Sequence, residues 1–152
     1  MMNEARIKHL ELIQGVVTRH QQNSFASRGW VVTLLAAVLA LSAKEANPLH
    51  FLVALIPTVV FWGLDGYYLR QERLFRKLYD NVRTIPADEL ENNPFSMDTL
   101  PYTFRQFAEN MPAAATQVAT WCRTCWSKTI GWLYGSLVAT ILAAFLLAFA
   151  LR

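Results

Sequence analysis

The chain contains 152 residues, of which 54% are hydrophobic and only 16% are charged. An average soluble domain has about 25% charged residues, and this composition excludes a disordered tail and a coiled-coil rod. The two cysteines are too few to hold a small secreted domain together. The apolar residues gather in three blocks, which indicates an all-α membrane protein with three transmembrane helices.

Residues 1–24 form the first predicted unit, a cytoplasmic amphipathic helix. Apolar side chains recur there at helical spacing, at Ile7, Leu10, Ile13 and Val17. We expect this helix to pack on the cytoplasmic helix that follows the second span. A helix lying on the membrane surface and a ligand-sensing helix are the alternatives.

The second predicted unit, residues 25–64, is a transmembrane helical hairpin with a short turn. Its first apolar block is shorter than a bilayer core unless Arg28 and Lys44 extend their side chains to the two interfaces. The second block carries Pro57 near its middle. Proline lacks the N–H that an interior helical turn uses, so we expect a kink at this position.

The third predicted unit, residues 65–128, is a cytoplasmic helix–loop–helix that begins with a helix over 65–83. Asp65 stands at the inner end of the second span, where a carboxylate needs a partner. A cap, or an ion pair with an arginine of this segment or of the N-terminal helix, is expected; a proton- or ion-coupled role is the alternative. Arg70 and Arg73 belong to a basic collar, which is either a solvated face or a phosphate-binding site.

Three prolines break residues 84–104, and the apolar content of this segment predicts a loop that packs on its own helices or on a neighbouring subunit. Residues 113–128 are predicted to be a helix that runs directly into the third span. Cys122 and Cys125 have the C-x-x-C spacing, but no second ligand pair and no strand–helix context accompany them. They are predicted to be buried small residues.

Residues 129–152 form the fourth predicted unit, a helix long enough to span the bilayer. Small residues recur in it every four positions, at Gly131, Gly135, Ala139 and Ala143. Such a row lets helix backbones approach closely in lipid. It is predicted to meet either the chain's own hairpin or the same helix of another subunit. Aromatic residues expected at the membrane interface are Trp121, Trp126, Trp132 and Tyr134.

The basic residues predict the orientation. Of the 14 Lys and Arg residues, 12 lie in the N-terminal flank or between the second and third spans. Positive residues favour the cytoplasm, so the N-terminus is predicted to be cytoplasmic and the C-terminus periplasmic. The net charge of +3 is then an orientation signal, and the lipid bilayer rather than nucleic acid is the expected partner. Neither a catalytic motif nor a cofactor or metal signature is present, which predicts that the chain is not an enzyme.

Three stretches of the chain resemble known bacterial proteins: ARIKHLELIQGVVTRHQQNSF, FWGLDGYYLRQERLFRKLYDNVR and NPFSMDTLPY. Together with the membrane hairpin they resemble a widespread group of small inner-membrane proteins of mostly unassigned function. The architecture is also similar to the SLATT-type two-helix membrane effectors of anti-phage systems. In that resemblance the helix after the hairpin is a shared element, with Asp65, Tyr68, Arg73, Phe75 and Tyr79. The third span departs from the two-helix plan.

The resemblance implies a homo-oligomer that permeabilises or depolarises the bacterial inner membrane when a cytoplasmic signal or protein partner triggers it. Two alternatives remain open at this point. One is a non-catalytic structural or adaptor subunit of a membrane complex. The other is a small channel.

Overall fold

The computed structural model describes residues 4–44, 48–86, 95–99 and 120–151. All regular structure within these residues is helical, which confirms the predicted all-α class. The elements are α1 (Glu4–Ser42), the 3-10 helix η1 (Pro48–Ala54), α2 (Leu55–Thr84) and α6 (Lys128–Ala150), with a short helical segment over 120–125.

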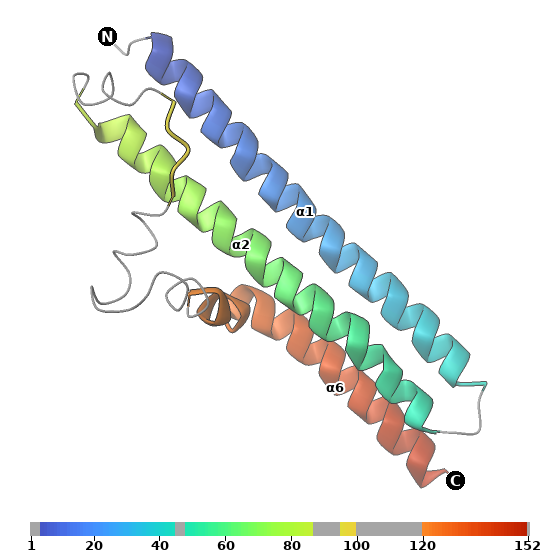
Figure 1. Ribbon diagram of the computed structural model, residues 1–152. Helices are drawn as coiled ribbons and strands as arrows, with labels where there is room; N and C mark the ends of the chain where they lie inside the picture. Colours follow the sequence, from blue (N-terminus) through green and yellow to red (C-terminus); the bar gives the residue numbers. More distant parts are fainter. Residues whose placement is uncertain (1–3, 45–47, 87–94, 100–119, 152) are drawn as a thin grey trace.

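Figure 1 shows α1 and α2 as a long antiparallel hairpin, with α6 lying against one half of it. The chain starts at one end of the bundle and finishes at the other. Three segments, Glu4–Ser42, Pro48–Thr84 and Lys128–Ala150, are long and apolar enough to cross a membrane. The three predicted spans are therefore all helical. No break in α1 separates the predicted units 1–24 and 25–64.

A buried cluster joins α1 to α2 at the end of the bundle that holds the N-terminus. Its buried members are Leu10, Ile13, Val17, Leu78 and Val82. Each such side chain contributes about 1.5–3 kcal/mol when fully removed from water. This packing confirms the predicted contact between the N-terminal helix and the helix after the second span. Ile7 departs from the predicted stripe and is 41% exposed.

Two further clusters fasten α6 to the hairpin. One contains Val31 of α1 with Ile130 and Tyr134 of α6, and the next contains Leu35 of α1 with Ile141 of α6. The contact residues of α6 recur at helical spacing along one stripe, so the described residues leave the rest of its circumference uncovered. Only 11% of the most apolar stretch of α6 is buried.

Pro57 lies in the first turn of α2, because α2 begins at Leu55. The residues before it, Pro48–Ala54, form the 3-10 helix η1. N–H groups in the first turn of an α-helix have no intrahelical partner, so a proline there removes no bond. The predicted mid-span kink is wrong: the chain changes helix type before the proline.

A break precedes α6. The helical segment over 120–125 ends in a turn, and Ser127 adopts an extended backbone with φ −67° and ψ 152°. The axis of the short segment is turned away from that of α6 (Figure 1). The prediction that one helix runs directly into the third span is therefore wrong at Trp126 and Ser127. The first part of that predicted helix lies outside the described residues.

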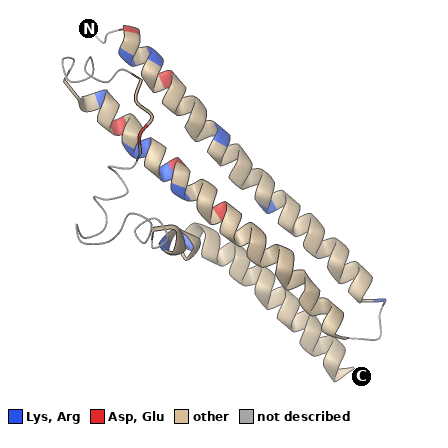
Figure 2. Cartoon of the chain, viewed as in Figure 1, with Lys and Arg blue, Asp and Glu red and all other residues tan. Residues whose placement is uncertain are grey.

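Within the described residues, charged side chains lie in the half of the bundle that holds the N-terminus, apart from Lys44 at the hairpin tip (Figure 2). The opposite half consists of uncharged helix surface. We call the charged half the basic end. Of the predicted loop 84–104, the described residues 95–99 lie at this end, and His9 bonds the carbonyl oxygen of Ser96 through Nε2 at 3.0 Å.

Candidate functional site

Asp65 is fully buried between α1 and α2, where it forms a polar cluster with two residues of α1. Arg28 donates from Nε to Asp65 Oδ2 at 2.8 Å and from Nη2 to Oδ1 at 3.4 Å. The Ser24 hydroxyl donates a further bond to Oδ1. The ion-pair partner of Asp65 therefore comes from the N-terminal helix, which is one of the two predicted sources.

The sequence brings these groups together through helical spacing. Ser24 and Arg28 are four residues apart, so both lie on the face of α1 that turns toward α2. The Arg28 side chain is 31% exposed, whereas that of Asp65 has no exposure. Two charge-assisted bonds and one hydroxyl bond satisfy the buried carboxylate. This arrangement joins the two arms of the hairpin next to the apolar half.

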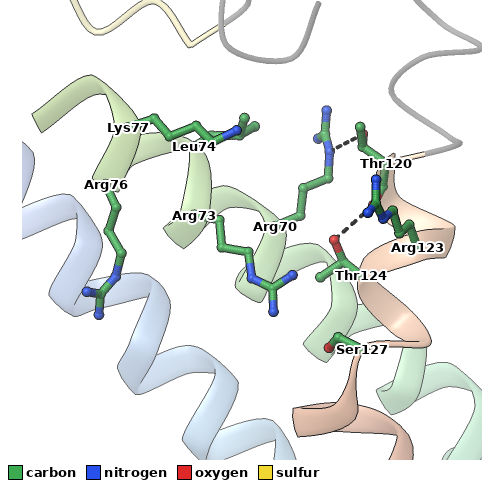
Figure 3. A pocket seen from close by; sticks show the side chains of 9 residues that line it. All are labelled: Arg70, Arg73, Leu74, Arg76, Lys77, Thr120, Arg123, Thr124 and Ser127. Atoms are coloured by element: carbon green, nitrogen blue, oxygen red, sulfur yellow. Dashed lines mark hydrogen bonds between the residues drawn. The ribbon is translucent and has the colours of Figure 1, made fainter. Parts of the chain in front are cut away.

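The predicted site residues Arg70 and Arg73 line a pocket at the basic end, between α2 and the segment over 120–125 (Figure 3). The pocket has a volume of about 440 Å³. Five of its lining residues come from α2 and four from the segment that leads into α6. They are Arg70, Arg73, Leu74, Arg76, Lys77, Thr120, Arg123, Thr124 and Ser127. We call this feature the basic pocket.

The cations of the basic pocket differ in their partners. Arg70 donates from Nε to the Thr120 hydroxyl at 2.9 Å, and burial lowers its pKa from the ordinary arginine value. Arginine titrates so far above neutrality that it stays charged. Arg76 donates to Glu72 at 2.8 Å on its own helix. Sequence reasoning identifies the basic collar of α2 but not the opposite wall of the pocket, because Arg123 lies 53 residues after Arg70 in the chain.

A tight joint fixes that wall on α2. A Cβ placed on Gly66 would contact the Sγ of Cys125, and one on Gly63 would lie 3.3 Å from Trp121. Trp121 donates from Nε1 to the Gly63 carbonyl at 3.0 Å, and Trp62 donates to the Cys125 carbonyl at 2.9 Å. Sequence reasoning missed this joint, although two glycines three residues apart in α2 were a possible signal.

The aromatic residues of the predicted interfacial belt differ in their exposure. Trp126 and Trp132 are 77% and 81% exposed. Trp121 instead lies in the tight joint, and Tyr134 is fully buried with its hydroxyl donating to the Phe61 carbonyl at 3.1 Å. The polar atom of each side chain donates a hydrogen bond to a backbone carbonyl of α2. Neither side chain therefore needs water or lipid headgroups as a hydrogen-bond partner.

The small-residue row of α6 faces away from the hairpin. Cβ atoms placed on Gly131 or Gly135 would have no neighbouring atom within 4 Å. Gly135, Ala139 and Ala143 are exposed, and the row lines a shallow groove with Trp132. Of the two predicted partners for this row, the chain's own hairpin is therefore excluded by position. We call this feature the small-residue face.

The two cysteines occupy different environments. Cys125 is buried in the tight joint, where burial raises the pKa of its thiol, whereas Cys122 is exposed. The prediction that both are buried is wrong for Cys122, because the short segment presents only one face to α2. In the part of the chain that the structure describes, His, Cys, Asp and Glu form no group of three or more that could hold a metal ion.

Comparison of the chain with protein-family models, curated proteins and solved structures finds no match. The resemblance to bacterial membrane effectors therefore stays a prediction.

Proposed function

We propose that this chain is a homo-oligomeric inner-membrane effector that permeabilises or depolarises the membrane when triggered. The observation that carries the proposal is the small-residue face of α6, which no part of the described chain covers. In lipid, apolar area gives little drive for helix association, and close backbone approach through small residues is what promotes it. A second copy of α6 is the partner that this face suits best.

Polar side chains border the small-residue face. Ser136 and Thr140 are exposed, and each hydroxyl bonds a carbonyl of its own helix, at 2.7 and 2.9 Å. Such hydroxyls are compatible with lipid in one protomer and with a water-filled path when several copies meet. An anti-phage or stress-defence role rests on the resemblance alone.

The proposal includes an orientation. The N-terminus and the basic end lie in the cytoplasm, and the C-terminus lies in the periplasm, since positive residues flank spans on the cytoplasmic side. A trigger would then reach the basic end, where Asp65 and Arg28 connect the two arms of the hairpin. Movement of one arm there would be transmitted along helices that continue into the membrane.

Induction of the chain in bacterial cells, followed with a membrane-potential dye, tests the proposal. We expect depolarisation with the wild-type chain and its loss with Gly131→Leu/Gly135→Leu, which fills the small-residue face. Leu146→Ala/Leu147→Ala changes exposed residues elsewhere on α6 and serves as the control. Depolarisation that survives the glycine substitutions would contradict the assembly mechanism.

Chemical crosslinking of the same variants separates the alternatives. A stable complex with a different polypeptide and an unchanged membrane potential would favour the adaptor subunit. A selective ion flux that Asp65→Asn abolishes would favour the small channel.

A further inference from the structure

The basic pocket contains more positive charge than the described chain neutralises. Four arginines and one lysine line it, and none of its lining residues is acidic. Arg76 has a carboxylate partner in Glu72. Among the described residues, no carboxylate lies within ion-pair distance of Arg73, Lys77 or Arg123.

Cations line the pocket from two walls rather than from one helix alone. Arg70, Arg73 and Lys77 are three, four and seven residues apart, so they share one face of α2. Arg123 approaches from the opposite wall, which the tight joint holds in place (Figure 3). If the basic collar were only a solvated helix surface, its cations would lie on α2 alone. Cations on two walls of a cleft instead surround a common volume.

Hydroxyl groups complete the lining, and one of them has no hydrogen-bond partner among the described residues. The Oγ of Ser127 is buried and makes no hydrogen bond within the described chain. Ser127 is the N-cap residue of the 23-residue helix α6, yet its side chain forms no capping bond. The first backbone N–H groups of α6 therefore add a positive dipole end beside an unused hydroxyl.

We propose that the basic pocket binds a phosphate-bearing anion, either a soluble pyrophosphate-type ligand or the phosphodiester of an anionic lipid headgroup. Arginine pairs with phosphate oxygens through two parallel N–H bonds, and Lys77 adds a point charge. The volume of about 440 Å³ lies within the range of small-molecule sites. The residues named here all come from one chain, so this inference does not depend on assembly.

The basic pocket lies where both a lipid headgroup phosphate and a soluble phosphate-bearing anion can reach it. Arg70 follows the buried Asp65 by five residues, which is about 8 Å along a helix. The pocket therefore begins where the uncharged part of α2 ends. Lipid phosphates occupy that level of a bilayer, and soluble anions reach it from the water side.

Two binding measurements on the full chain distinguish the sources. In nanodiscs of zwitterionic lipid, calorimetric titration with inorganic pyrophosphate reports soluble-anion binding. In mixed micelles with phosphatidylglycerol, native mass spectrometry counts the anionic lipids that each protein molecule retains. Binding in either arm supports the proposal and names the source.

Matched variants show whether the site is the basic pocket. Arg73→Gln/Arg123→Gln removes two pocket cations, whereas Arg19→Gln/Arg83→Gln removes two exposed cations outside it. We expect at least about tenfold weaker binding in the first variant, and less than about twofold in the second. Ser127→Ala, which loses no bond within the described chain, should weaken binding about fivefold.

Two results would overturn the proposal. One is an equal loss of binding in the two arginine pairs, which would identify a diffuse electrostatic attraction. The other is the absence of saturable binding in both arms for the wild-type chain. Ser127→Ala keeps the test decisive if Arg73→Gln/Arg123→Gln fails to fold, because unchanged binding in Ser127→Ala would also contradict the proposed site.

Discussion

Asp65 illustrates what a single residue contributes at the border between the charged and apolar halves. A fully buried carboxylate is costly unless charge and hydrogen bonds satisfy it, and Arg28 with Ser24 does both. The need for a partner was predictable from the sequence. The identity of the partner was not, because Arg28 and Asp65 are 37 residues apart and meet only through the register of the hairpin.

Removal of Arg28 and removal of the Asp65 carboxylate are expected to lower the free energy of unfolding by different amounts. Arg28→Met leaves the Asp65 carboxylate buried without its cation, and we expect a loss of about 2–3 kcal/mol. Asp65→Asn keeps a bond to Ser24 and leaves a partly exposed arginine that can turn toward water, so a loss of about 1 kcal/mol is expected. Thermal unfolding in detergent micelles measures both.

The double variant Arg28→Met/Asp65→Asn provides the control. It removes both charges, so it should be more stable than Arg28→Met alone. If Asp65→Asn proves the more damaging single change, the buried carboxylate is not what Arg28 compensates.

At the scale of elements, glycines that look alike in sequence have opposite surroundings. Gly66 allows the segment over 120–125 to approach α2, whereas Gly131 faces open space on α6. The G-x-x-x-G spacing predicted a close helix contact on α6. The closer contact within the chain is on α2, and only the placement of Cys125 against Gly66 reveals it.

Substitution by alanine separates the two glycines. Gly66→Ala places a methyl group against the Cys125 side chain, and we expect a loss of about 1–3 kcal/mol despite the better helix propensity of alanine. Gly131→Ala meets no neighbour and should leave stability unchanged or raise it by up to about 1 kcal/mol. Thermal unfolding of the detergent-solubilised chain is the measurement.

A second change checks the cause. Gly66→Ala/Cys125→Ala removes the sulfur that the new methyl group would meet, so part of the lost stability should return. Equal effects of Gly66→Ala and Gly131→Ala would mean that the short segment does not dock as closely as the structure places it.

At the scale of the whole molecule, charge and apolar surface divide the bundle along its length. Charged residues gather at the basic end, and the other half of each long helix is uncharged, apart from Lys44 among the described residues. In the proposed membrane orientation, this division would place the basic end in water and the uncharged length in the bilayer. It also places the basic pocket next to the border between them.

The whole-molecule orientation leads to a prediction that reporter fusions can check. With the N-terminus and residues 65–128 in the cytoplasm, a fluorescent protein should fluoresce at the N-terminus. Alkaline phosphatase should be active at the C-terminus, because it folds only after export. A phosphatase fused after residue 86, which lacks the third span, should be inactive. The reverse activities would contradict the positive-inside orientation.

Composition and periodicity were enough to predict the helical class and three helices long and apolar enough to cross a membrane, and they favoured the pairing of the N-terminal stripe with α2 over its two alternatives. These are local properties, since each follows from apolar runs and from side chains three or four residues apart. The position of Pro57 shows the limit of such reasoning. Its effect depended on where α2 begins, because a proline in the first turn removes no intrahelical bond.

Only the tertiary structure decided which partners meet. It paired Asp65 with Arg28 and docked the segment over 120–125 on Gly66, and no described residue covers the small-residue face of α6. Each of these depends on contacts between residues distant in sequence, which helical periodicity does not encode. The physical reason is that a helix has several usable faces, and packing of the whole bundle selects which of them is buried.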